Sequence, residues 1–311
     1  MGPSDSTPPP LPRSRTSPSL LSIEELERFK NLLLFAQATV DGFFAGQHRS
    51  PHPGSSVEFR DYKDYVAGDD LGRIDWRAYG RTRKLFVRRY EDETDMVAYL
   101  LVDTSGSMRY AGEKRAPKFH HAARIAAALA YLMLRQGDKA ALALFDQTVK
   151  TYFPPGGTRR HLHDLVRALE EVKAGSGTGL AASLHQCAAV FKKRGRLVVL
   201  SDFFTDPVPL LDALTQFSHR GFNILLLQVL DPDELDLPAH SVAKYVDMET
   251  GEQVEVDAAE LRAAYQKKVR AAIDTLAAAA HTRGIEHQLV NTSQPYTHAL
   301  EAYLGFRGRS G

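Results

Sequence analysis

The feature that most constrains this chain is a regular alternation, from residue 96 onward, of short apolar runs with segments of helical period. Residues 96–102 and 222–230 are apolar almost without a break, which is typical of strands buried on both faces of a sheet. Residues 117–135 instead repeat their apolar side chains along one helical face. Strands that alternate with helices in this way form a mostly parallel sheet with helices on both faces. The sequence therefore predicts an α/β fold for residues 96–304.

Two neighbouring apolar runs depart from this alternation. Residues 140–145 and 149–153 are separated only by Asp146, Gln147 and Thr148, which predicts a hairpin and hence an antiparallel edge of the sheet. The other elements expected are helices at 159–172, 180–193, 209–220 and 258–282, strands at 197–200 and 285–290, a hairpin around 250–251 and a short last helix.

The chain before residue 96 has a different character. Residues 1–21 are rich in proline and serine, which predicts a disordered tail. Ser22 followed by Glu25 fits a capping box at the start of an amphipathic helix. Residues 22–95 are thus predicted to combine this helix with an irregular segment, from residue 42, that contains short strands at 57–59 and 85–90. At the other end, residues 305–311 are predicted to form a flexible tail.

Composition limits the classes of partner. The formal net charge is +1, so no overall field attracts nucleic acid or an anionic membrane, and we expect neither as a partner. The longest apolar run, residues 125–134, is shorter than the roughly 20 residues of a membrane-spanning helix, so no span is expected. Cys187 is the single cysteine and cannot form an internal disulfide, which indicates a cytoplasmic protein.

Oxygen-bearing side chains directly follow the first buried run. Asp103, Ser105 and Ser107 offer one carboxylate and two hydroxyls on a tight Asp-x-Ser-x-Ser loop. In open α/β sheets, binding sites gather at the carboxyl ends of the strands. Carboxylate and hydroxyl oxygens suit hard cations, whereas the imidazole or thiolate that zinc and copper prefer is not offered here. The pattern therefore predicts a site for Mg²⁺, or for Mn²⁺ or Ca²⁺.

Two more polar residues stand at equivalent positions. Thr178 opens a predicted helix and Asp202 closes a predicted strand, although Thr178 could be a helix cap and Asp206 is a nearby substitute for Asp202. The order Asp-x-Ser-x-Ser, Gly-Thr-x-Leu and Asp resembles the metal-ion-dependent adhesion site (MIDAS) of von Willebrand factor A domains, which have a Rossmann-like fold. The resemblance implies that a carboxylate of a partner protein takes the open position on the cation. The ligands that it implies, direct or through water, are Asp103, Ser105, Ser107, Thr178 and Asp202.

The segment ahead of this domain carries a second resemblance. Residues 57–62, 65–70, 73–76 and 85–87 read VEFRDY, YVAGDD, RIDW and LFV. Together they resemble the bacterial domain-of-unknown-function family 58 (DUF58). Members carry this block just ahead of a von Willebrand factor A domain and are often encoded beside MoxR-type AAA+ ATPases. The resemblance therefore implies such an ATPase, or a client protein with an exposed Asp or Glu, as the partner.

Two classes of function compete. We expect a cation-dependent protein-binding module without catalytic residues, working as an adaptor for the ATPase in protein assembly or chaperone-like work. The alternative is a metal-dependent phosphotransfer hydrolase with Asp103 as nucleophile, although such enzymes use a second aspartate where this chain has Ser105. The sequence has no P-loop consensus, so nucleotide hydrolysis falls to a partner. Arg73, Asp75 and Trp76 could form a buried ion pair beside an aromatic anchor or a second binding surface.

Overall fold

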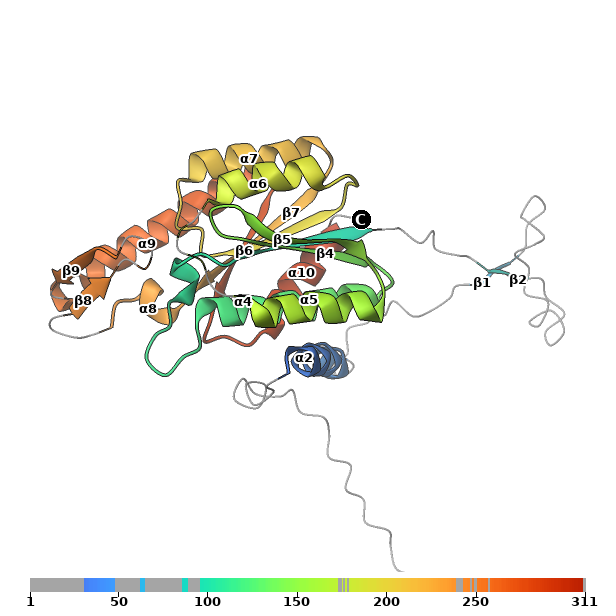
Figure 1. The fold of residues 1–311 in the computed structure, drawn as a ribbon, viewed down its shortest axis with the longest axis horizontal. Coiled ribbons are helices and arrows are strands. Elements are labelled where there is room, and N and C mark those ends of the chain that lie inside the picture. Colours follow the sequence, from blue (N-terminus) through green and yellow to red (C-terminus); the bar gives the residue numbers. More distant parts are fainter. Residues whose placement is uncertain are drawn as a thin grey trace, which may run out of the picture.

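The computed structural model describes residues 31–47, 62–64, 86–88, 96–172, 175, 177, 179–238, 243–246, 248, 251–256 and 258–309. Its centre is a six-stranded sheet (Figure 1). From edge to edge the strand order is β10-β7-β6-β3-β4-β5, and all neighbours are parallel except β4 and β5. The predicted α/β class and the antiparallel edge are confirmed. The strands are β3 (Val97–Asp103), β4 (Lys139–Phe145), β5 (Val149–Gly156), β6 (Arg196–Ser201), β7 (Asn223–Leu230) and β10 (Glu286–Asn291).

Helices cover both faces of the sheet (Figure 1). Helices α4, α5 and α10 lie on one face, and α6, α7 and α9 lie on the other. Alternate residues of β3 enter opposite cores: Leu100 lies in the first and Leu101 in the second. Because both faces are buried, the central strands need continuous apolar sequence. The helices are α4 (Lys118–Arg135), α5 (Arg159–Glu171), α6 (Leu180–Val190), α7 (Pro207–His219), α9 (Ala258–His281) and α10 (Thr297–Arg309).

Helix α2 (Leu32–Gln47) packs on the outer side of α4 and α5 (Figure 1). Phe35 and Val40 are fully buried in the same core as α4. The sequence predicts irregular chain from residue 42, but the helix continues to Gln47 because Phe43 still packs in this core. The prediction that irregular chain begins at residue 42 is therefore wrong. Helix α2 also packs in the same core as the domain that follows it.

Between α2 and the sheet, the structure describes two short strands. β1 (Tyr62–Asp64) and β2 (Phe86–Arg88) pair in antiparallel fashion, and β2 falls within the strand predicted at 85–90. The predicted tail at 1–21, the strand at 57–59 and the Arg73-Asp75-Trp76 block lie outside the described residues.

The C-terminal end of the chain differs from its prediction. Helix α10 extends to Arg309, whereas the sequence predicts a flexible tail from residue 305. Gly305 and Gly308 disfavour a helix, but Phe306 between them is buried near Tyr303, at 6.3 Å between ring centroids, and holds the last turn on the domain. The hairpin predicted around residues 250–251 is confirmed by β8 (Ala243–Val246) and β9 (Gln253–Val256).

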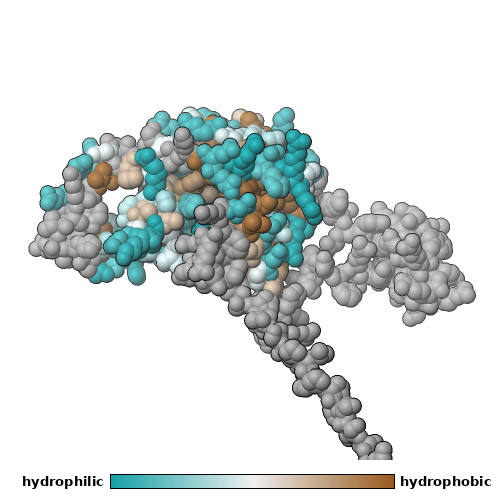
Figure 2. Space-filling model, turned by 60° about the horizontal axis from the view of Figure 1, so that its bottom comes forward, coloured by the Kyte–Doolittle hydropathy of each residue, from teal (hydrophilic) through white to brown (hydrophobic). Residues whose placement is uncertain are grey.

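The outer surface is mostly polar. Figure 2 shows hydrophilic residues over most of the visible described surface, with hydrophobic residues in separate patches. Within the described ranges, no helix has the length and apolar character needed to cross a membrane. Phe204, in the loop between β6 and α7, and Val208, in the first turn of α7, are among the exposed large hydrophobic side chains. These two residues lie close to the carboxyl edge of the sheet, where the sequence predicts the site.

Candidate cation site at the carboxyl edge of the sheet

Asp103 is the last residue of the central strand β3, and its side chain is 0% exposed. The parallel register pairs Val102 with Leu200, so the next residue of β6, Ser201, lies beside Asp103. The Ser201 hydroxyl donates to Asp103 Oδ2 at 2.6 Å, and the backbone N–H of Ser105 donates to Asp103 Oδ1 at 2.8 Å. Each oxygen of Asp103 therefore accepts at least one hydrogen bond.

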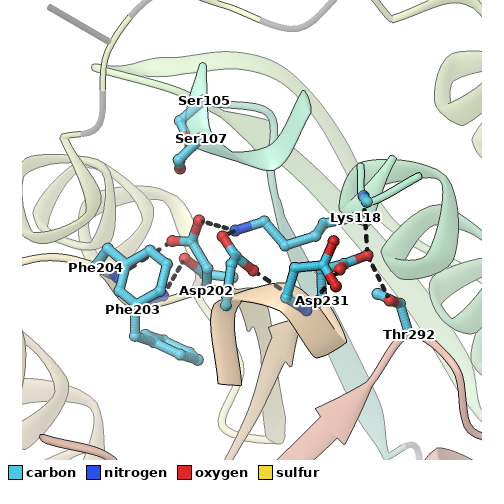
Figure 3. Close-up of polar contacts among 12 residues, drawn as sticks. Ser105, Ser107, Lys118, Asp202, Phe203, Phe204, Asp231 and Thr292 are labelled. Carbon is cyan, nitrogen blue, oxygen red and sulfur yellow. Dashed lines mark hydrogen bonds and ion pairs between the residues drawn. The ribbon is translucent and has the colours of Figure 1, made fainter. Parts of the chain in front are cut away.

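The loop after β3 brings the two serine hydroxyls together. Ser105 Oγ and Ser107 Oγ are 3.1 Å apart, and Figure 3 shows both side chains on one turn of this loop. Thr104 anchors the loop because its backbone N–H and its hydroxyl both donate to the Phe145 carbonyl, at 2.7 Å and 2.8 Å. Ser105 is buried and Ser107 is half-buried, so the pair faces a partly accessible space. The predicted carboxylate and hydroxyls thus lie on one short segment.

Asp202 follows β6 at the same edge of the sheet and is 1% exposed. Its Oδ1 accepts a hydrogen bond from the Phe204 backbone N–H at 3.2 Å, and its Oδ2 accepts one from Lys118 Nζ at 2.7 Å. The next residue, Phe203, has a positive φ of 55°, a strained conformation for a bulky side chain that is common at functional sites. Asp206, the possible substitute, caps α7 by accepting from the Val208 N–H. Asp202 is therefore the carboxylate that lies near Asp103.

The two carboxylates disfavour each other's charge. Burial, followed by the nearby charge of Asp202, raises the pKa of Asp103 to about 7, although hydrogen bonds from Ser201 and Ser105 act in the opposite direction. Positive charge close by would favour the ionised form of Asp103. A bound cation would supply it.

Thr178 lies outside the described residues, but its neighbours are placed. The Gly175 N–H donates to the Thr104 carbonyl at 2.6 Å, and the Gly179 N–H donates to the Asp146 carbonyl at 2.8 Å. These contacts connect the segment on either side of Thr178 to the loops that follow β3 and β4. A Cβ at Gly179 would meet the Gln147 carbonyl oxygen at 2.2 Å, so this approach requires glycine.

The structure adds residues to the site that sequence reasoning missed. Lys118, the first residue of α4, is 0% exposed and pairs with both Asp202 and Glu234 (Figure 3). Nothing in the helical pattern distinguishes it from an exposed lysine. Glu234 belongs to the short helix α8 (Pro232–Leu235), which was not predicted. The run Asp231-Pro232-Asp233-Glu234 is a capping-box sequence with proline at the first helical position, and it could have revealed α8.

Asp231 is the centre of a second polar cluster beside the first. It accepts hydrogen bonds from Arg115, from the Gly112 backbone N–H and from Thr292, and its own N–H donates to Glu234 (Figure 3). Burial alone would raise the pKa of Asp231, but the bonds from Arg115 and the backbone hold it below its usual value. These hydrogen bonds of Asp231 fix α8, and hence hold Glu234 beside Lys118.

An apolar groove begins at the residue after Asp202. Its volume is about 520 Å³, and it lies between the start of α7 and helix α9. Lys268 is the one charged residue among the described residues that line it. Phe204, at its rim, is 51% exposed. The candidate site is therefore continuous with a surface that can hold an apolar side chain. Other lining residues are Phe203, Leu210, Tyr265, Val269 and Leu276.

The donors at the edge of the sheet fit a hard cation. Asp103, Ser105 and Ser107 offer only oxygen atoms, which is the set that Mg²⁺, Mn²⁺ and Ca²⁺ prefer. Throughout the described part of the chain, no three His, Cys, Asp or Glu side chains gather as a metal-binding cluster. A divalent ion at this loop would depend on hydroxyl oxygens, as the sequence predicts.

The strand order and the site together define the class. Numbered along the chain, the six strands run 3-2-1-4-5-6, which is the doubly wound order, and the third is antiparallel. With Asp-x-Ser-x-Ser at the end of the first strand, this is a von Willebrand factor A-like domain. The chain belongs to the family described as "Protein of unknown function DUF58", whose pattern matches residues 61–275.

Several known proteins are similar to this chain. "Uncharacterized protein Rv1480" of Mycobacterium tuberculosis and "Uncharacterized protein Mb1516" of Mycobacterium bovis are each 28% identical to it, over 71% of this chain and 70% of theirs. Among solved structures, the conserved hypothetical protein BatB from Bacteroides thetaiotaomicron is 14% identical, with a TM-score of 0.48, over 69% of this chain and 98% of that one. The SpRpn10 VWA domain is 10% identical, with a TM-score of 0.42, over 67% and 94%.

Proposed function

We propose that this protein is a protein-binding module that uses a divalent cation to bind an exposed Asp or Glu of a partner. The observation that carries the proposal is the meeting of the buried Asp103 carboxylate with the paired hydroxyls of Ser105 and Ser107 at one strand end. Thr178 and Asp202 would complete the ligand set, directly or through water. The von Willebrand factor A-like fold and the family membership support an interaction module.

The chemistry of the donors supports a docking role for the ion. Hydroxyl groups carry no formal charge, and Asp103 is the one carboxylate of the Asp-x-Ser-x-Ser motif. A divalent ion held this way keeps unneutralised positive charge, so a partner carboxylate that reaches it gains a strong interaction. We propose Mg²⁺ as the ion, with Mn²⁺ or Ca²⁺ as substitutes.

The apolar groove supports a peptide-like partner. It starts at Phe203, directly after Asp202, so a partner segment with its carboxylate at the cation could place a neighbouring apolar side chain against Phe204. Burial of an aromatic anchor next to a fixed charge is a common basis for specificity. Phe204→Ala is expected to weaken partner binding about tenfold or more, with little effect on cation affinity.

We propose that a MoxR-type AAA+ ATPase, or a client protein delivered to it, provides this carboxylate. Support comes from membership of the DUF58 family together with the resemblance of the N-terminal block to members encoded beside such ATPases. The protein would then act as an adaptor in protein assembly or chaperone-like work, and the ATPase would hydrolyse the nucleotide.

Calorimetry with the purified chain tests the proposal. Mg²⁺ and Mn²⁺ are titrated into wild-type protein, Asp103→Ala and the control Asp212→Ala, which removes an exposed carboxylate from α7. Each protein is then titrated with the ATPase in the presence of Mg²⁺ or of EDTA. Cation binding by the wild type and the control, lost in Asp103→Ala, is expected, and ATPase binding should require Mg²⁺. ATPase binding that is equal in EDTA would contradict the docking role of the cation.

A further inference from the structure

Lys118 is a buried cation at the edge of the candidate site. Its side chain is 0% exposed, and its Nζ lies 2.7 Å from Asp202 Oδ2 and 2.6 Å from Glu234 Oε1. The Phe204 ring covers the ammonium, with its centroid 5.0 Å away. Lysine is almost never fully buried unless its charge is paired, so these carboxylates must offset a considerable desolvation cost.

The position of Lys118 at the start of α4 does not by itself favour a lysine. Lys118 is the first residue of α4, where the helix dipole is positive and a lysine is unfavourable. Neither helix propensity nor packing of an apolar face explains an ammonium at this point. The side chain instead reaches from α4 toward the end of β6 and ends at Asp202 (Figure 3).

The charges around Lys118 do not balance by themselves. Asp202 and Glu234 share the buried ammonium of Lys118, and Asp103 lies near Asp202 without an ion pair to the lysine. Lys118 contacts Asp202 and Glu234 directly, whereas the hydrogen bonds of Asp103 come from Ser201 and Ser105. The two aspartates therefore have different partners: Asp202 is paired with Lys118, whereas Asp103 ends β3 beside the loop that carries the serine hydroxyls.

We propose that Lys118 is a built-in cation that competes with the divalent ion for Asp202. The inference rests on the proposed function, since it concerns the same site. In the native protein the ammonium neutralises Asp202, so the ion depends on Asp103 and the hydroxyls. The ion then binds less tightly but keeps more positive charge for a partner carboxylate. Lys118 thus sets the balance between cation affinity and partner affinity.

The test removes the lysine while limiting the charge left buried. Lys118→Met with Glu234→Gln deletes the ammonium and one of its two carboxylates, which leaves Asp202 free to face the ion. Glu234→Gln alone is the matched control because it keeps the Lys118–Asp202 pair. Lys118→Gln, which replaces the ammonium by a neutral polar side chain, gives a second comparison if the double variant folds poorly. Circular dichroism and thermal unfolding check the fold, and Mn²⁺ binding is measured by electron paramagnetic resonance and calorimetry.

The double variant is expected to bind Mn²⁺ at least about tenfold more tightly than the wild type, because a freed carboxylate a few ångströms from a dication interacts strongly. Glu234→Gln alone is the baseline for the lysine deletion, so the double variant should also bind Mn²⁺ at least about tenfold more tightly than Glu234→Gln. If only the lysine-free variants bind Mn²⁺, the inference stands and the proposed function of the native chain fails. Equal or weaker binding by the lysine-free variants would overturn the inference while wild-type binding upholds the cation site. If none of the proteins binds Mn²⁺, both proposals are refuted.

Discussion

A buried histidine under α10 should make this protein acid-sensitive. His121 lies on α4, is 4% exposed and stacks on Tyr296, with ring centroids 4.3 Å apart. Its Nε2 has no hydrogen-bond partner among the described residues. Burial, followed by the nearby charge of Arg124, lowers the pKa of His121 to about 3. The folded state therefore holds this imidazole neutral at a pH where the unfolded chain would protonate it.

The size of the effect follows from the difference between the two pKa values. Between the ordinary pKa of 6.5 and the folded value of about 3, the unfolded state binds one more proton, so stability falls as the pH falls. The slope approaches about 1.4 kcal/mol per pH unit below pH 6.5, which makes the loss about 2 kcal/mol between pH 6.5 and 4.5. Well above pH 6.5 both states are neutral at this residue, and the contribution disappears.

Chemical denaturation of the wild type and His121→Phe at several pH values measures how much of the pH dependence of the unfolding free energy comes from His121. Phenylalanine keeps a ring against Tyr296 but cannot be protonated, so the variant is expected to lose about 2 kcal/mol less than the wild type between pH 6.5 and 4.5. His163→Phe, on the exposed face of α5, is the control and should keep the wild-type pH dependence. Parallel pH profiles for the wild type and His121→Phe would refute the argument.

Three further substitutions have expected outcomes. Asp103→Asn removes one of two neighbouring buried charges, so the metal-free variant should be as stable as the wild type or more stable in thermal unfolding. Mg²⁺ should no longer stabilise it. A stabilising effect of Mg²⁺ in the variant would argue against the site. Phe217→Ala empties a fully buried position against Phe222, 5.3 Å away between centroids, and should cost about 3–5 kcal/mol in urea unfolding; a cost below about 1 kcal/mol would contradict the assigned core. Gly179→Ala places a Cβ 2.2 Å from the Gln147 carbonyl, so it should displace the loop that carries Thr178 and weaken Mn²⁺ binding in calorimetry; unchanged binding would remove that loop from the site.

Much of the fold could be predicted because both faces of the sheet are covered. Strands such as β3 and β7 are almost continuously apolar, and the helices between them repeat with a helical period, so each leaves a local sequence signal. The prediction failed where tertiary burial outweighs local preference. Phe43 extends α2 beyond Gly42, and Phe306 holds α10 together between two glycines.

The candidate site could be predicted only where its residues are contiguous or end a strand. Asp103, Ser105 and Ser107 form one short motif, and the register of two parallel strands brings Asp202 close to it. Lys118 was missed because it lies at the start of a helix, where a lysine normally faces water. Its burial depends on Asp202 and Glu234, which are 84 and 116 residues away in sequence. Such a long-range ion pair leaves no local pattern.

The central claim is that a divalent cation binds at the loop after β3, and anomalous diffraction tests it most directly. Crystals of the full chain grown with Mn²⁺ would be measured at the manganese absorption edge, with Asp103→Ala crystals as the control. The account predicts an anomalous peak within about 2.5 Å of the Ser105 and Ser107 hydroxyl oxygens, a distance typical of direct ligands, and no peak in the variant. A wild-type map with no peak at this loop, or with its only peak elsewhere, would contradict the account.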